Sequence, residues 1–168
     1  MITFQKIRWK NFLSTGDHWS EIDFLGHTTN LVVGTNGSGK STMLDALTFS
    51  LFNKPFRKIN KSQLINATNE KDCVVEVEFT VNNKDYLVRR SIKPNKFDIE
   101  VNGTLLHKES DDRLNQKILE ESILKVNYKS FTQIVILGSS SFVPFMQLST
   151  SNRRDVIEDL LDIRIFSA

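Results

Sequence analysis

One short run of residues has the composition of a phosphate-binding loop. The run Gly34-Thr35-Asn36-Gly37-Ser38-Gly39-Lys40-Ser41 fits the pattern G-x-x-x-x-G-K-[ST] without a mismatch. Its glycines let the backbone curl tightly, so that consecutive N–H groups can surround a polyphosphate. A helix that begins at the end of the loop adds further N–H groups and the positive end of its dipole. The sequence therefore predicts a nucleotide-binding site at residues 34–42.

Three side chains at the end of this run have separate expected roles. Lys40 carries a positive charge suited to the β- and γ-phosphates of a nucleotide. The hydroxyl of Ser41 is a hard oxygen of the kind that Mg²⁺ prefers. Thr42 is placed for the α-phosphate. We therefore expect Mg²⁺ to accompany the nucleotide, with Ser41 as one of its ligands.

The flanking segments have the periodicities that such a loop needs. Residues 28–33 (TTNLVV) are short, β-branched and apolar toward their end, which is typical of a buried strand. Leu44, Leu47 and Leu51 then recur on one face of a helix expected over 40–52. A strand that enters the loop and a helix that leaves it favour a real nucleotide site over a chance glycine loop.

The remaining segments predict one α/β domain. Alternating apolar and polar residues predict strands, and Asn82-Asn83 and Asn102-Gly103 predict turns that join several of these strands into an antiparallel meander. Helices are expected over 109–125 and again after a cap at Ser149 or Ser151. The expected strands lie at residues 2–9, 19–25, 75–81, 86–92, 97–101 and 131–137.

Composition limits the class of protein. The 168 residues carry 22 Lys and Arg against 20 Asp and Glu, so no overall basic excess indicates a nucleic-acid partner. Cys73 is the single cysteine and permits no internal disulfide, which fits a reducing compartment. No apolar run approaches the ~18 residues of a membrane span, and the first residues lack the apolar segment of a signal peptide. We expect a soluble cytoplasmic domain with no membrane partner.

Two local basic runs are candidates for contacting DNA phosphates. The first consists of Lys54, Arg57, Lys58 and Lys61. The second lies within residues 84–96 and contains Arg89 and Arg90. Each run is equally consistent with an ordinary solvated face. Because neighbouring residues of a strand point to opposite sides, Arg89 and Arg90 cannot both belong to one surface.

Three further features accompany the phosphate loop. Lys10-Asn11-Phe12 closes the first strand, Ser130-Phe131-Thr132-Gln133 opens a late apolar run, and Asn152-Arg153-Arg154 leads into a charged helix. Together with Gly34–Thr42, they resemble the amino-terminal half of an SMC-like ATPase head. The resemblance covers essentially the whole chain. It points to the coiled-coil DNA-break repair ATPases of the SbcC and Rad-fifty type, and most of all to the large subunit of the phage recombination endonuclease.

This resemblance implies a fold and a set of site residues. The fold would be an ABC-type α/β ATPase head half, with residues 1–150 forming the amino-terminal half of the lobe and residues 151–168 starting a coiled-coil arm. ATP with Mg²⁺ would be the ligand. Lys40 and Gln133 would serve catalysis, and Gln133 would reach Mg²⁺ near the attacking water. The positions that would border the adenine and ribose are Asn11 and Ser14, with Lys10 and Leu13 beside them.

The resemblance also implies partners. Two heads would dimerise over two nucleotides, and each head would be completed by its own carboxyl-terminal half. DNA and a nuclease of the Mre-eleven/SbcD type would be the further partners. The completed protein would hydrolyse ATP and regulate that nuclease at DNA ends.

Two parts of a complete ATPase site are not found in this sequence. There is no signature loop of the Ser-Gly-Gly type, and the apolar run Ile134–Leu137 is followed by Gly138 rather than by an acid. We therefore expect the chain alone to bind nucleotide without efficient turnover. Two alternatives stay open: the nucleotide-binding domain of an ABC transporter, which the distance from Lys40 to Gln133 argues against, and a non-catalytic, nucleotide-dependent interaction module.

Overall fold

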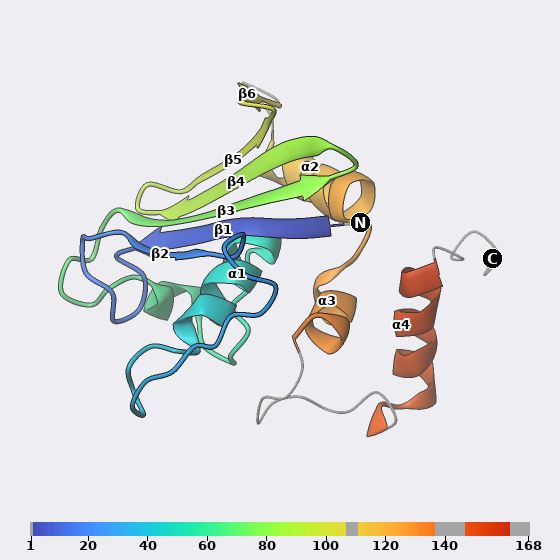
Figure 1. The fold of residues 1–168 in the computed structure, drawn as a ribbon, viewed down its shortest axis with the longest axis horizontal. Coiled ribbons are helices and arrows are strands. Elements are labelled where there is room, and N and C mark those ends of the chain that lie inside the picture. The colour runs from blue at the N-terminus through green and yellow to red at the C-terminus, as the bar shows by residue number, and fades with distance from the viewer. Residues whose placement is uncertain (1, 107–110, 137–146, 162–168) are drawn as a thin grey trace. The chain divides into compact units, whose positions relative to one another are not determined.

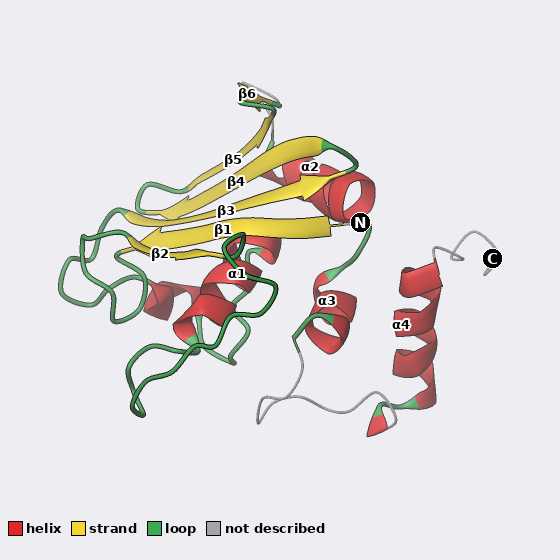
Figure 2. Ribbon diagram, viewed as in Figure 1, coloured by secondary structure: helices red, strands yellow, loops and turns green. Residues whose placement is uncertain are grey.

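The computed structural model describes residues 2–106, 111–136 and 147–161. Its backbone divides into two compact units, residues 1–115 and 116–168. The first unit is built on a six-stranded antiparallel sheet with the strand order β2-β1-β3-β4-β5-β6 (Figures 1 and 2). The strands are β1 (Ile2–Lys10), β2 (Ser20–Asp23), β3 (Cys73–Val81), β4 (Lys84–Ile92), β5 (Lys96–Val101) and β6 (Thr104–Leu105).

The predicted meander is confirmed. Strands β3, β4, β5 and β6 follow one another in sequence and in space, and the turns after β3 and β5 fall at the predicted asparagines. Asn82, Asn83 and Asn102 all adopt the left-handed conformation that such tight turns require, with φ of 49°, 61° and 49°. The two predicted strands at the start of the chain are confirmed as β1 and β2.

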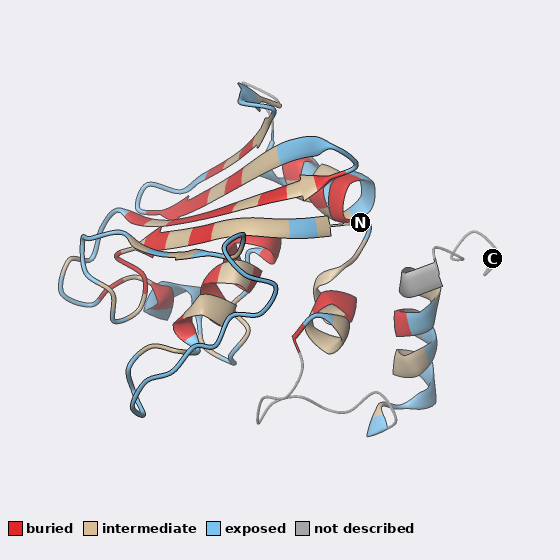
Figure 3. Ribbon diagram, in the orientation of Figure 1, coloured by how far each residue is buried: buried red, intermediate tan, exposed pale blue. Residues whose placement is uncertain are grey.

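One face of the sheet forms the core with helix α1 (Thr42–Phe52). This helix lies along β1, β3 and β4 and covers the inner face of the sheet (Figure 1). Alternate residues of β3 point toward it and are fully buried, which gives the banded burial pattern along the strands in Figure 3. The largest fully buried side chains of this unit are Phe12, Phe49, Phe79, Ile7, Leu51, Leu64, Ile99, Val75, Val77 and Val88.

The other face of the sheet carries a network of charges. Glu76 of β3 is 3% exposed and accepts hydrogen bonds from Arg8 of β1 and Arg89 of β4. Arg89 also pairs with Glu100 of β5 at 3.6 Å. Arg90 points to the opposite side, where it is buried with its guanidinium 3.6 Å from the centre of the Phe97 ring. The prediction that Arg89 and Arg90 belong to different surfaces is confirmed.

The strand expected at residues 28–33 is not formed. These residues lie in an irregular segment that leads into the phosphate loop, and the side chains of Leu31 and Val33 are 85% and 78% exposed. A buried strand needs neighbouring strands to take its backbone hydrogen bonds, and none of the described strands pairs with this segment. The apolar pattern is strand-like, but the prediction of a strand in this chain was wrong.

The second unit is helical. The chain forms α2 (Asp112–Lys117), continues directly into the π-helix η2 (Ile118–Leu124), and ends that helical stretch at Lys125, which has φ 54°. This agrees with the helix predicted over 109–125, of which residues 109 and 110 lie outside the described ranges. A helix after Ser149 is also confirmed: α4 (Thr150–Leu161) begins there, and the Ser149 hydroxyl accepts from the Asn152 N–H at 3.4 Å.

The strand predicted over 131–137 is wrong. Residues Tyr128–Ile134 form helix α3, which contacts α4. Asn127 caps α3 by accepting from the Ser130 N–H at 2.9 Å, and such a cap fixes the first turn of a helix. This local cap decides the structure over the β-branched residues that follow. Gly138 and the serines after it lie outside the described residues.

Candidate nucleotide-binding site

The phosphate loop has the curled backbone that its sequence predicts. Gly37 and Gly39 have φ of +86° and +90°, values that side chains rarely allow. Two short backbone bonds close the curl: the Ser38 N–H donates to the Thr35 carbonyl at 3.2 Å, and the Thr42 N–H donates to the Gly39 carbonyl at 2.9 Å. The loop ends where α1 begins, so the first amides of the helix face the space that the loop encloses.

The two side chains expected to act on phosphate and metal are at the mouth of this loop. The Lys40 ammonium donates to the carbonyls of Gly34 at 2.6 Å and Thr35 at 2.8 Å, and both carbonyls belong to the loop itself. Ser41 stands at the position before α1, where serine commonly caps a helix, yet its side chain makes no capping bond. An exposed hydroxyl that the helix does not use fits the hard oxygen donor that a magnesium ion needs.

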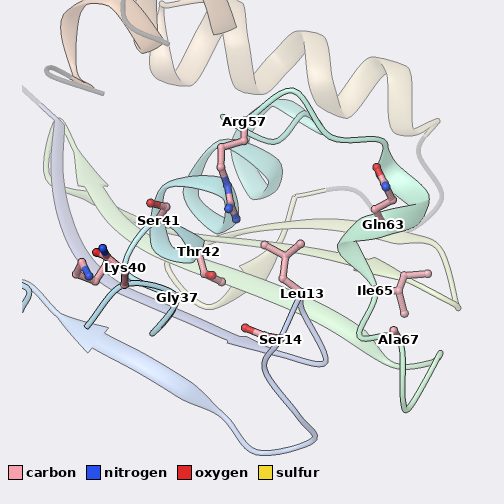
Figure 4. A pocket seen from close by; sticks show the side chains of 12 residues that line it. Leu13, Ser14, Gly37, Lys40, Ser41, Thr42, Arg57, Gln63, Ile65 and Ala67 are labelled. Carbon is pink, nitrogen blue, oxygen red and sulfur yellow. The ribbon is translucent and has the colours of Figure 1, made fainter. Parts of the chain in front are cut away.

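A cavity of about 570 Å³ opens next to the loop. It is lined by Leu13, Ser14, Asn36, Gly37, Gly39, Lys40, Ser41, Thr42, Arg57, Gln63, Ile65 and Ala67. Figure 4 shows Lys40 and Ser41 at one end, Ile65 and Ala67 at the other, and Leu13 between them. One end is therefore rich in amides, hydroxyls and cations, and the other is largely apolar, as a site for a phosphorylated ligand with a hydrophobic group should be.

Arg57 is a site residue that the sequence did not single out. It belongs to the first basic run, but its side chain turns to Asp45 of α1: Nε donates to one carboxylate oxygen at 2.6 Å and the Arg57 N–H donates to the other at 2.9 Å. Asp45 is fully buried, so the guanidinium is held in place at the cavity wall. No motif signals this role, because it depends on contact between the helix and a loop twelve residues later.

The predicted adenine-side residues divide into two groups. Leu13 and Ser14 line the cavity. Asn11 does not: it is 1% exposed, and its side-chain amide is used in bonds to Asp17 and Asn69. Lys10 is also outside the cavity lining and pairs with Asp17 at 3.4 Å. Gln63, Ile65 and Ala67 were missed, because their approach to Leu13 is a long-range contact with no local signature.

Gln133 belongs to the second unit. It lies in α3, and its side-chain oxygen is buried without a hydrogen-bond partner among the described residues. A buried amide oxygen without a partner is unusual and fits an atom that binds a ligand. Its assignment as a magnesium ligand stays a prediction.

The two basic runs present less free charge than their sequence indicates. In the first, Arg57 is paired with Asp45, and burial lowers the pKa of Lys61, which lies 6.0 Å from the Phe49 ring. In the second, Arg89 is paired with Glu76 and Arg90 is buried. Lys84, Lys93 and Lys96 are the exposed residues of the second run. Neither run is a continuous cationic surface.

With the loop and cavity in view, comparison with known proteins assigns the class. A family model described as an AAA domain matches residues 6–165, so the chain belongs to this family of AAA domains. A solved structure from work on the ATP-driven dimerization and DNA-stimulated activation of SMC ATPases superimposes with a TM-score of 0.58 at 23% identity. The superposition covers 94% of this chain and 99% of the other. The predicted SMC-like head fold is confirmed.

Similar sequences agree with this class. The chain is 44% identical over 158 residues to exonuclease subunit 2 of Enterobacteria phage T4, which covers 94% of this chain and 28% of the phage protein. It is 28% identical over 163 residues to a DNA double-strand break repair Rad50 ATPase of Sulfolobus acidocaldarius, covering 95% of this chain and 17% of the archaeal protein. It is 30% identical over 148 residues to a subunit of nuclease SbcCD from Clostridium acetobutylicum, covering 79% and 12%. The predicted resemblance is confirmed, and the chain spans less than a third of each of these relatives.

Membrane spans and acidic or histidine-rich metal clusters are both absent from the described part of the chain. None of the helices in residues 2–106, 111–136 and 147–161 is both long enough and apolar enough to cross a membrane. Within the same ranges, His, Cys, Asp and Glu do not gather in groups of three or more that could hold a metal ion.

Proposed function

We propose that this chain is the ATP-binding amino-terminal half of the head of a DNA repair or recombination ATPase. The complete protein would hydrolyse ATP and regulate a partner nuclease of the Mre-eleven/SbcD type that processes DNA ends. The observation that carries the proposal is the cavity whose phosphate-loop end bears Lys40 and the uncommitted Ser41 hydroxyl and whose other end is apolar. The relatives, which are named as exonuclease subunits and double-strand-break repair ATPases, support the nuclease and the DNA.

The proposed ligand is ATP with Mg²⁺. The amides of residues 36–42 and the Lys40 ammonium would bind the phosphates, and Arg57 adds a second cation at the cavity wall. The Ser41 hydroxyl and the Gln133 side-chain oxygen would hold Mg²⁺. When bound, that ion neutralises charge on the β- and γ-phosphate oxygens. Lys40 would leave the two loop carbonyls that it now contacts and bind phosphate in their place.

Further partners follow from what the described residues lack. The exposed apolar residues Leu31 and Val33 form a strand-like run beside the loop, and this run has no neighbour in the described sheet. We propose that the carboxyl-terminal half of the same head pairs with residues 28–33, and that it also brings the signature loop and the general base. Two such heads would dimerise over two nucleotides. Residues 1–150 would belong to the head, α4 would start the coiled-coil arm, and the protein would act in the cytoplasm.

One specific observation favours a non-catalytic interaction module as the second candidate. The sequence holds no signature loop and no acid at the end of an apolar strand, so this chain by itself has no visible group to activate water. Both candidates predict ATP binding, and only the first predicts turnover in the complete protein.

Turnover in the complete protein separates the two candidates. We would measure phosphate release with and without linear DNA, and with the nuclease present. The ATPase predicts steady turnover that falls in Lys40→Ala, whereas Lys84→Ala, an exposed lysine at the start of β4, leaves it unchanged. Tight ATP binding with no turnover under any of these conditions favours the interaction module.

A further inference from the structure

The apolar end of the cavity is made by two loops that are far apart in sequence. Leu13 and Ser14 come from the turn after β1, and Ile65 and Ala67 come from the segment between η1 (Lys61–Leu64) and β3. Neither segment is part of a helix or strand, so neither has a regular hydrogen-bond ladder to fix it. The geometry of this end of the cavity must be set by specific side chains.

Backbone contacts bring the two loops together at one point. Phe12 and Ile65 form an isolated antiparallel bridge, and the Leu13 N–H donates to the Leu64 carbonyl at 2.7 Å. The Asn66 N–H donates to the Asn11 carbonyl at 2.9 Å. These backbone bonds join the loops, but they leave the carbonyl of Leu13 to be bound by a side chain.

Three asparagines complete the junction. Asn66 donates its Nδ2 to the Leu13 carbonyl at 3.1 Å, while its Oδ1 accepts from the N–H groups of Thr68 and Asn69, each at 3.0 Å. Asn69 donates its Nδ2 to Asn11 Oδ1 at 2.6 Å. Asn11 and Asn66 are 1% and 8% exposed, so these bonds are shielded from water and hold the two loops in one arrangement.

The same junction holds two residues in a conformation that they would not adopt freely. Asn11 and Leu13 have φ of 50° and 53°, in the left-handed region. Asparagine tolerates this region, but leucine does so only when its surroundings impose it. Here Asn66 binds the Leu13 carbonyl and Leu64 binds its N–H, so Leu13 stays in the cavity lining between the phosphate loop and Ile65 (Figure 4).

We propose that Asn66, with Asn11 and Asn69, is a positioning residue for the nucleobase. The three asparagines lock the loop that carries Leu13 and Ser14 against the loop that carries Ile65 and Ala67, and the apolar wall so formed takes the flat face of the base. This inference rests on the proposed function of the cavity. It assigns the base a separate support from the phosphates, which the residues of the phosphate loop bind.

The test compares two ligands that share phosphates and differ in the base. We would measure the affinity of the complete protein for ATP and for inorganic tripolyphosphate, both with Mg²⁺. The wild-type protein should bind ATP more tightly, and the ratio of the two affinities reports the base. Asn66→Asp keeps the acceptor for Thr68 and Asn69 and loses only the donor to Leu13, so it should lower this ratio by about fivefold to tenfold, as expected for one hydrogen bond.

Two further variants keep the inference open to contradiction. Leu13→Ala removes a wall side chain without touching any of the asparagine bonds, and it should lower the same ratio even if Asn66→Asp folds poorly. Ser91→Ala is the matched control, because it removes another shielded bond from a side chain to a backbone carbonyl, to Pro94 at 2.7 Å, at the far end of β4. This control should leave the ratio unchanged.

The outcomes separate the inference from the function beneath it. Equal loss of ATP and tripolyphosphate affinity in Asn66→Asp and Leu13→Ala contradicts a role at the base, and so does an unchanged ratio in both variants. A wild-type protein that binds the two ligands equally well also overturns the inference, while the phosphate site stands. A wild-type protein that binds neither ligand overturns the proposed function itself.

Discussion

Asp45 and Arg57 form an ion pair in which the carboxylate is fully buried in the first turn of α1 and the guanidinium is 46% exposed at the cavity wall. The carboxylate also accepts the Arg57 backbone N–H at 2.9 Å, so both ends of the arginine are tied to one residue. Because α1 starts at the phosphate loop, this pair fixes the loop after α1 relative to the phosphates. A basic residue that the sequence offers for DNA is thereby placed at the nucleotide.

Arg57→Ala should destabilise the protein by about 1–3 kcal/mol, less than the loss of a fully buried partner because the arginine is half exposed. The variant leaves the Asp45 carboxylate buried with one backbone donor. Urea denaturation of Arg57→Ala beside Lys58→Ala, the exposed neighbour in the same basic run, measures the difference. Equal stability of the two variants would contradict a structural role for the pair.

Glu76→Gln should destabilise the sheet by about 2–4 kcal/mol, because it leaves two guanidiniums on a shielded surface without their anion. Glu76 accepts from Arg8 and Arg89, and its hydrogen bond is the main reason that the pKa of Arg89 is raised. Thermal unfolding beside Glu78→Gln, a half-buried residue on the same face of β3, checks this. A melting temperature as high as that of the control variant would refute it.

Cys73 makes stability depend on pH in the alkaline range. Burial raises the pKa of its thiol from 9.0 to about 12. The unfolded chain loses this proton near pH 9 and the folded chain keeps it until about pH 12, so the free energy of unfolding falls as pH rises between these values. Denaturant titrations at pH 8 and pH 10 should show this loss, and Cys73→Ala should show less of it. An identical pH slope in the two proteins would count against a buried neutral thiol.

Gly39→Ala should weaken nucleotide binding by about tenfold, because an L-residue at φ +90° costs ~1–2 kcal/mol and drives the loop out of its curl. Space is not the limit, since the nearest atom to an added Cβ is Thr42 Oγ1 at 3.6 Å. Gly16→Ala is the control, because an added Cβ there meets nothing within 4 Å. Calorimetric ATP affinities that match in the two variants would show that the curl is not needed.

Local patterns predicted most of the fold. The phosphate loop, α1 and the meander depend on glycine positions, on periodicity and on the Asn82-Asn83 and Asn102-Gly103 turns, all of which act within a few residues. The strand predicted at residues 28–33 failed because a strand needs a neighbour, and the described sheet does not supply one. The strand predicted over 131–137 failed because the Asn127 cap starts a helix there.

The site was predicted only at its phosphate end. Lys40, Ser41 and Thr42 stand in one motif, so their types and spacing were enough. Arg57, Gln63, Ile65 and Ala67 reach the cavity through contacts with α1 and with the turn after β1, and no short pattern encodes such contacts. Asn11 was predicted near the base, but its buried side chain places it behind the wall instead of in it.

The central claim is that the loop at residues 34–42 binds the phosphates of ATP with Lys40 as its cation. The direct measurement is a calorimetric titration of MgATP into the complete protein, the Lys40→Ala variant and the Lys84→Ala variant. We predict saturable binding in the wild type and in Lys84→Ala, and an affinity lower by about tenfold to a hundredfold in Lys40→Ala, as expected for loss of a charge-assisted phosphate contact. No heat of binding in the folded wild-type protein, or the same affinity in Lys40→Ala, would contradict the account.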